Sequence, residues 1–139
     1  MSVYKTQRKE GELLAITKAR DAAEYTMKIT HNEKVFPKKA RYTVVKKLQD
    51  KAVEMVMLTV EANEIYPRNR LEYEARHAKQ IEAMAAARAI MSVADMCIEL
   101  YGIAPSRVEY WTKQLTIARN TISGWCKKDA ERFKEYVDK

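Results

Sequence analysis

Three prolines divide this chain into four long segments, and this division constrains the fold more than any other feature. Pro37, Pro67 and Pro105 stand in short breaks, and Gly102 lies just before the last of them. Proline is tolerated in the first turn of a helix, whereas glycine favours the position just past a helix end. The breaks therefore predict helices over residues 11–31, 37–65, 70–101 and 105–128. With only three Gly and three Pro in 139 residues, few turns remain for a β-protein.

The segments and their short connections predict one all-α domain over residues 1–139, an antiparallel up-down four-helix bundle. A chain of this length is sufficient for a hydrophobic core. A polar arm runs to about Lys9. The stretch after Asp129 is either an extension of the last helix or a flexible tail.

Apolar residues at helical spacing predict which face of each helix forms the core. In the last helix they step by 3 and 4 residues, as in a coiled-coil core: Val108, Trp111, Leu115, Ala118, Ile122 and Trp125. In the first helix they are Leu13, Ile16, Ala19, Ala23 and Met27. In the second they are Val45, Leu48, Ala52 and Met55. In the third we assign the core stripe to Leu71, Ala75, Ala78, Ala85, Ala89, Val93, Met96 and Leu100.

Two segments, residues 52–62 and 81–100, are apolar on more than one side. A helix of this kind is buried on more than one side. One interpretation is a generous core with some exposed Met and Ala, and the other is a subunit interface. We expect the second, a closed homo-oligomer whose interface contains Val53, Met57, Val60, Met84 and Met91.

Positive charge is concentrated in two stretches of a chain whose net charge is +7. Residues 34–51 hold seven bases and one acid, which gives +6, and residues 105–128 hold five bases and one acid, which gives +4. On a helical wheel, the lysines opposite the apolar faces are Lys39, Lys46, Lys47, Lys51, Lys113 and Lys127. Such stripes attract phosphates through counterion release, with little regard to sequence. They are either solvated faces or, on neighbouring helices, a surface for RNA or DNA.

The start of the second helix is a candidate phosphate site in its own right. Pro37 would set the first turn, so that free N–H groups point the same way as Lys38 and Lys39. A helix N-terminus favours anions because of its partial positive charge. We therefore expect phosphate to be held from Lys38 to Lys51.

Residues for catalysis or metal binding are not evident. His31 and His77 are isolated, and the two His and two Cys lack ligand spacing. Glu74 and His77 have the Glu-x-x-His spacing of di-iron bundles, but no second copy exists. Glycine-rich phosphate loops are absent from the sequence. We expect a protein that is not an enzyme and needs no metal or cofactor.

The sequence predicts a cytoplasmic location. The N-terminus lacks the apolar region of a signal peptide, and no apolar run is long enough to cross a membrane. Cys97 and Cys126 lie far apart in sequence, and we expect them to be reduced and packed rather than joined in a disulfide.

Two stretches resemble a known family. "FPKKARYTVVKKLQDKAVEM" (residues 36–55) resembles the "FPKEERYGL…QIRRAA" helix start of a family of small four-helix bundles. Its members include proteins encoded in intervening sequences of bacterial ribosomal RNA genes and the accessory variability determinant (Avd) of bacterial and phage diversity-generating retroelements. "VEYWTKQLTIARNTISGWCKK" (residues 108–128) resembles the last helix of the accessory protein. The "IPSNIAEG" stretch of the ribosomal branch is replaced by "MLTVEANEIY", which favours the retroelement branch.

The resemblance implies a protein without chemistry of its own. It implies a basic homopentamer that binds template RNA and the reverse transcriptase of the retroelement and supports mutagenic cDNA synthesis. The phosphate contacts it implies are Lys38, Lys39, Arg41, Lys46, Lys47, Lys51, Arg119, Lys127 and Lys128. The alternative is an interaction protein of the same fold that binds no nucleic acid.

Overall fold

The computed structural model describes residues 13–137, and all regular structure in that range is helical. The four long helices are α2 (Leu14–His31), α3 (Lys46–Glu64), α4 (Arg70–Tyr101) and α5 (Pro105–Arg132). A short helix, α6 (Lys134–Val137), follows α5. The polar arm expected up to Lys9, and residues 11 and 12 of the first predicted helix, lie outside the described range.

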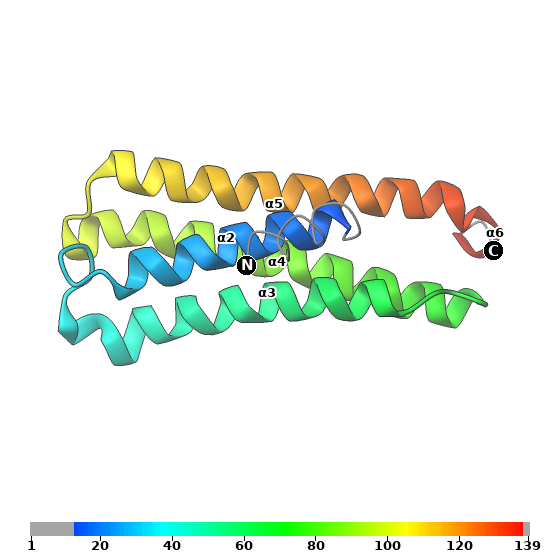
Figure 1. Ribbon diagram of the computed structural model, residues 1–139, viewed down its shortest axis with the longest axis horizontal. Helices are drawn as coiled ribbons and strands as arrows, with labels where there is room; N and C mark the ends of the chain where they lie inside the picture. Colours follow the sequence, from blue (N-terminus) through cyan, green and yellow to red (C-terminus); the bar gives the residue numbers. More distant parts are fainter. Residues whose placement is uncertain (1–12, 138–139) are drawn as a thin grey trace, which may run out of the picture.

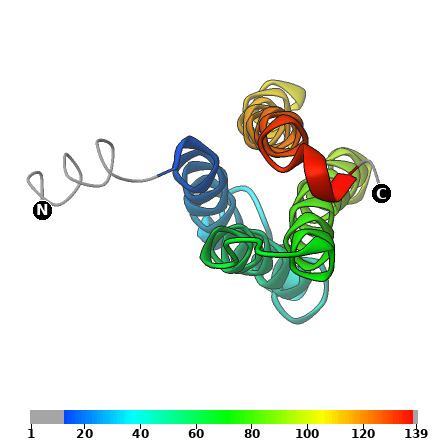
Figure 2. The same cartoon turned by 90° about the vertical axis from the view of Figure 1, so that its right-hand side faces the viewer.

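The long helices lie side by side along the longest dimension of the molecule (Figure 1). Each packs against two others: α2 against α3 and α5, and α4 against α3 and α5. Seen from the end, the four axes surround a common interior (Figure 2). The α2–α3 connection and the α4–α5 connection lie at one end of the molecule, on the left in Figure 1, and α6 lies at the other.

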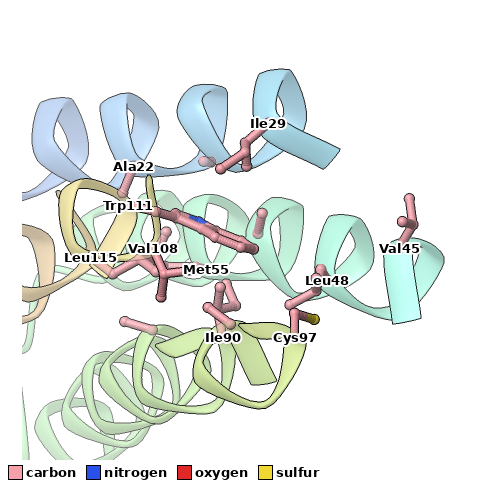
Figure 3. Packing of buried hydrophobic residues seen from close by; sticks show 14 of the residues in the cluster. Ala22, Ile29, Val45, Leu48, Met55, Ile90, Cys97, Val108, Trp111 and Leu115 are labelled. Atoms are coloured by element: carbon pink, nitrogen blue, oxygen red, sulfur yellow. The ribbon is translucent and has the colours of Figure 1, made fainter. Parts of the chain in front are cut away.

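Trp111 is the centre of the larger hydrophobic cluster (Figure 3). Its side chain on α5 is completely buried among residues of α2, α3 and α4 that include Ile29, Leu48 and Ile90. The indole Nε1 donates to Thr26 Oγ1 at 2.9 Å, and that hydroxyl donates to Ala22 O at 2.8 Å. The polar atom of the indole is therefore satisfied inside the core, which a buried tryptophan requires.

The core stripes expected on the second and last helices are confirmed. Every member of the α5 stripe is buried, from Val108 to Trp125. Val45, Leu48, Ala52 and Met55 are buried as well. In both helices the strongest apolar period coincides with the buried face, so hydropathy alone identifies it.

The core stripe assigned to the third helix is wrong. Seven of its eight residues are exposed on α4, and Val93 is half-buried. The residues that face the core lie on a different side of the helix: Tyr73, Arg76, Gln80, Ala83, Ala86, Ala87, Ile90, Ala94 and Cys97. Hydropathy misleads here because Arg76 and Gln80 are polar and yet buried. The apolar stripe that we took for the core therefore faces outward.

A buried ion pair explains why Arg76 lies inside. Its Nε and Nη2 donate to the two carboxylate oxygens of Asp129 on α5, at 2.7 and 3.0 Å, and its Nη1 donates to Ile65 O at 2.9 Å. Gln80 Nε2 donates to the same carboxylate at 2.8 Å. The guanidinium also lies over the ring of Trp125, 5.0 Å from its centroid. These contacts satisfy both buried charges and join α4, α5 and the end of α3.

The ion pair also corrects the predicted end of the last helix. We expected this helix to stop at residue 128, whereas α5 continues to Arg132 because Asp129 is held inside. Phe133, the next residue, is buried against Tyr66 and Tyr73, with ring centroids 5.7 and 6.1 Å apart. Helical structure therefore continues past the predicted end, through α5 to Arg132 and into α6.

The two cysteines are free thiols. Cys97 is buried and Cys126 is half-buried, and burial raises the pKa of both thiols to about 11. Because the thiolate is the nucleophile, we expect the native protein to react slowly with a thiol-specific disulfide reagent at about pH 8. Unfolding in guanidinium chloride should release two fast-reacting thiols per chain. Equally fast reaction of both cysteines before unfolding would contradict this expectation.

Candidate nucleic-acid interface

The connection between α2 and α3, together with the start of α3, carries six of the ten expected phosphate contacts: Lys38, Lys39 and Arg41 on the connection and Lys46, Lys47 and Lys51 on α3. The connection is firmly anchored. Asn32 organises its first turn: Asn32 O accepts from the N–H groups of Val35 and Phe36 at 2.9 Å. The Phe36 ring is buried and meets the rings of Tyr101 and Trp111 edge-on, with centroids 5.9 and 6.0 Å apart. The connection therefore has a defined backbone on which charged side chains are held outward.

The start of the second predicted helix differs from a regular α-helix. A 3₁₀ turn (Lys38–Ala40) and a π-helical turn (Arg41–Val45) precede α3, and Pro37 is the capping residue rather than the first helical one. Ala40 and Val45 are both buried, five residues apart. An α-helix repeats a face after three or four residues, whereas a π-helix bonds residues five apart. The π turn therefore lets both residues face the core.

This geometry changes the interpretation of the phosphate site at the helix start. The regular hydrogen bonding of α3 begins at Lys46, beyond Lys38 and Lys39. Lys38 and Lys39 instead begin the 3₁₀ turn that leads through the π turn into α3. Their side chains are exposed all the same. What remains of the expected site is an exposed group of side-chain charges on an irregular, anchored backbone.

Half of the six expected bases in this region form ion pairs, and half do not. Arg41 pairs with Glu33 at 3.3 Å, Lys46 with Asp50 at 3.1 Å and Lys51 with Glu54 at 3.0 Å. All of these side chains are exposed, and such pairs are weak, typically worth about 0–1 kcal/mol. Within residues 13–137, no ion pair involves Lys38, Lys39 or Lys47. These three lysines are the bases most available to a phosphate.

The structure separates the second group of expected bases from the first. Lys113, Lys127 and Lys128 are exposed on α5 and Arg119 is half-buried. The helices α3 and α5 are not packing partners, because α2 and α4 lie between them. Residues 127–128 lie near the α6 end, whereas the α2–α3 connection is at the other end (Figure 1). The expected bases of the second stretch are therefore not on a packing partner of α3, and we restrict the candidate interface to the connection and the start of α3.

Three residues at this end were not among the expected contacts. Arg107, near the start of α5, and Lys34 line a common hollow beside the α4–α5 connection. Tyr42 stands among the lysines, and its side chain is 81% exposed. Lys34 and Arg107 belong to the two basic stretches, but their proximity depends on the packing of the connections. Tyr42 could have been singled out from its position within the basic run.

A second hollow opens between the end of α2 and the π turn. It has a volume of about 270 Å³. His31, Glu33, Lys38, Arg41 and Gln49 contribute polar groups to its lining, together with Thr30, and Phe36, Pro37 and Val45 contribute apolar surface. Gln49 is oriented by a hydrogen bond from its Nε2 to Thr30 Oγ1 at 3.0 Å. Donors, an acceptor carboxylate and apolar surface are thus combined at one place.

The expected interface residues fall on two different faces. Val53, Met57 and Val60 are exposed on the outer side of α3, which confirms a second apolar face there. Met84 and Met91 are half-buried and pack within the monomer against its two core clusters. The exposed apolar surface of α4 consists instead of the stripe that we had assigned to the core, including Ala89 and Met96.

Two apolar hollows on α3 have rims of opposite charge. The first contains Val53, Met57 and Leu58 and is bordered by Asp50, Glu54 and Glu61. The second lies between α3 and α4, where Lys47 and Lys51 border a groove lined by Val44, Leu48, Ala89, Ile90, Val93 and Met96. An acid-bordered apolar surface and a lysine-bordered apolar surface are complementary in charge.

The two histidines differ in burial, and His77 Nδ1 is buried without a hydrogen-bond partner among residues 13–137. The His77 ring stacks on Tyr73, with centroids 5.9 Å apart, and Glu74 pairs with Arg70 at 2.9 Å. His31 is exposed. No three His, Cys, Asp or Glu side chains in residues 13–137 are grouped as metal ligands would be. None of the helices in that range is both long and apolar enough to cross a membrane.

Comparisons with known proteins identify no relative. Neither the models of protein families, nor the curated proteins, nor the solved structures include a significant match to this chain.

Proposed function

We propose that this protein is a non-enzymatic, RNA-binding accessory protein of a diversity-generating retroelement. In this role it binds template RNA and the reverse transcriptase and supports mutagenic cDNA synthesis. The observation that carries the RNA-binding part of the proposal is a group of exposed lysines, Lys38 and Lys39 on the anchored connection and Lys47 in the first turn of α3. None of these three forms an ion pair within residues 13–137. Phosphate contacts from such lysines supply most sequence-independent affinity for nucleic acids.

Salt-dependent RNA binding tests this proposal. We expect the triple variant Lys38→Gln, Lys39→Gln and Lys47→Gln to bind RNA more weakly than the parent protein. Each lost phosphate contact lowers the slope of log affinity against log salt by ~0.7–0.9, so three contacts lower it by ~2–3. Binding is measured by fluorescence anisotropy across a salt titration. Thermal unfolding should change little, because the replaced side chains are exposed.

A matched control removes the same charge from another place. The variant Lys113→Gln, Lys127→Gln and Lys128→Gln also lowers the net charge from +7 to +4, but its changes lie on α5. We expect this variant to keep most of the salt slope. If both triple variants lost RNA affinity equally, net charge alone would explain the binding. If the first variant lost no RNA affinity, the result would contradict the proposed interface.

A homo-oligomer is the second part of the proposal. The monomer is taken as an antiparallel up-down four-helix bundle, which fits the connections gathered at its two ends (Figure 1). Its outer apolar surface on α3 and α4 supports assembly, and we assign this surface to a second copy of the chain because the two hollows have complementary rims. Contact between two different surfaces is heterologous and forms a ring where the rotation closes. The resemblance supplies the number five.

The reverse transcriptase is proposed from the resemblance of residues 36–55 and 108–128 alone. Co-expression with the reverse transcriptase of the same retroelement should give a complex that survives size-exclusion chromatography. A reverse-transcriptase gene and a template repeat beside this gene would support the same assignment.

A structural or interaction protein that binds no nucleic acid is the second candidate. The three ion pairs of Arg41, Lys46 and Lys51 favour it, since they already occupy half of the expected bases. A protein that binds no RNA even at low salt would support this second candidate.

A further inference from the structure

We infer that the basic connection binds single-stranded nucleic acid in preference to duplex, with the ring of Tyr42 stacked on an unpaired base. The inference rests on the proposed RNA binding and specifies the form of the RNA. It follows from three features of the connection: an exposed aromatic ring, lysines on both sides of it, and a polar hollow lined by Lys38 and Arg41.

Tyr42 is the most exposed of the large hydrophobic side chains in the described part of the chain, at 81%. The backbone explains this exposure, because the buried residues Ala40 and Val45 fix the turn on which Tyr42 stands. No aromatic ring among residues 13–137 packs against it. A large ring held in water by a fixed turn is available to a planar partner.

The lysines place phosphate-binding groups on either side of this ring. Lys38 and Lys39 precede Tyr42 by four and three residues, and Lys46 follows it by four. All three lysines are exposed and lie within about one helical turn of Tyr42 along the chain. A strand whose base stacks on the ring would therefore pass these lysines with its backbone. Proteins that bind single strands combine the same two elements, a positive surface and aromatic side chains under the bases.

Duplex RNA cannot use the ring in this way. Its bases are paired and stacked on one another, and its accessible surface consists of phosphates, 2′-hydroxyl groups and the shallow minor groove. The lysines would attract both forms, whereas Tyr42 adds affinity only for an unpaired base. Preference for single strands is therefore the measurable consequence.

The hollow between α2 and the π turn extends the same site. Arg41 Nη2 donates to Glu33 Oε1 at 3.3 Å in this exposed hollow, and Gln49 lies beside the pair, so donors and an acceptor are held together there. Arg41 follows Lys38 and immediately precedes Tyr42, so the hollow and the ring share one turn. An unpaired base next to the stacked one would find hydrogen-bonding groups there, which is how proteins read exposed base edges in single-stranded RNA.

Binding to oligouridine and to duplex RNA of the same length tests the inference. We expect Tyr42→Ala to lose about ten-fold in affinity for oligouridine and less than about two-fold for the duplex, since stacking is felt only by unpaired bases. Tyr42→Trp should keep the affinity, and its fluorescence should be quenched on binding oligouridine. The parent protein is the control for quenching, because Trp111 and Trp125 are buried. Circular dichroism checks that each variant is folded.

The outcomes separate this inference from the proposed function. A parent protein that binds neither probe at low salt overturns both. Binding of both probes with no selective loss in Tyr42→Ala, or tighter binding of the duplex, overturns only the single-strand inference. Oligodeoxyuridine is the third probe. If Tyr42→Ala loses as much affinity for oligodeoxyuridine as for oligouridine, the ring binds unpaired bases of both DNA and RNA. If it loses affinity for oligouridine alone, the ring is specific for RNA. Either result supports the stack.

Discussion

Asp129→Ala is expected to lower the free energy of unfolding by about 3–5 kcal/mol, a range typical of removing one partner of a buried ion pair. The substitution leaves the Arg76 guanidinium charged in a site where only 4% of the residue is exposed. It also removes the acceptor of Gln80 and the contact that holds the last turn of α5. The measurement is denaturant unfolding followed by circular dichroism at a fixed protein concentration, since assembly would add to stability.

Two controls isolate the cause of this loss. Asp50→Ala breaks the exposed pair with Lys46 and should cost less than about 1 kcal/mol, because exposed pairs contribute little. The double variant Arg76→Met with Asp129→Leu removes both charges and should regain much of the loss, since apolar replacement of a whole buried pair is often neutral. If Asp129→Ala were as stable as Asp50→Ala, the buried pair would not be what holds α5 to α4.

The contrast between α4 and α5 shows which part of the fold can be predicted from hydropathy. In α5 the stripe from Val108 to Trp125 is the most apolar face, and it is also the buried one. In α4 the buried face includes Arg76 and Gln80, while alanines and large apolar residues cover the outer face. Binary patterning assumes that polar residues face water, and a buried ion pair between distant helices violates this assumption. Arg76 and Asp129 are 53 residues apart, so local pattern carries no sign of their contact.

The candidate interface shows a similar limit. Charge density in residues 34–51 could be read from the sequence, and the lysines there are exposed. The π turn could not be predicted from the sequence, because it depends on the burial of both Ala40 and Val45 in the folded protein. The distance between the α5 bases and the connection could not be predicted either, because it depends on which helices pack against each other. Residue type predicted the positive charge of this surface, and packing decided which charged residues lie together on it.

Met57→Glu is expected to convert the proposed oligomer to monomers. Met57 is 54% exposed in the acid-bordered hollow of α3, so a charge there costs the folded monomer little. In the assembled protein the carboxylate would replace an apolar contact at the centre of the hollow, next to acids of its own chain. The lysines at the rim of the opposing groove would not fully compensate its desolvation. Light scattering after size-exclusion chromatography should give the 16.2 kDa mass of one chain. The parent protein is expected at five times that mass. A parent that is monomeric at micromolar concentration would contradict the oligomer itself.

Met96→Glu should have the same effect from the other surface, since Met96 is 48% exposed in the lysine-bordered groove between α3 and α4. Leu14→Glu, at an exposed apolar position on α2, should leave assembly intact. The decisive step is to mix the two disrupted variants. Each keeps one intact surface: Met96→Glu keeps the hollow around Met57, and Met57→Glu keeps the groove. If the hollow of one copy binds the groove of the next, the mixture forms a one-to-one dimer that cannot grow, although neither variant assembles alone. An isologous contact through the hollow would instead leave Met96→Glu assembled and give no new species on mixing. That result would overturn the pairing of the two surfaces while retaining the oligomer.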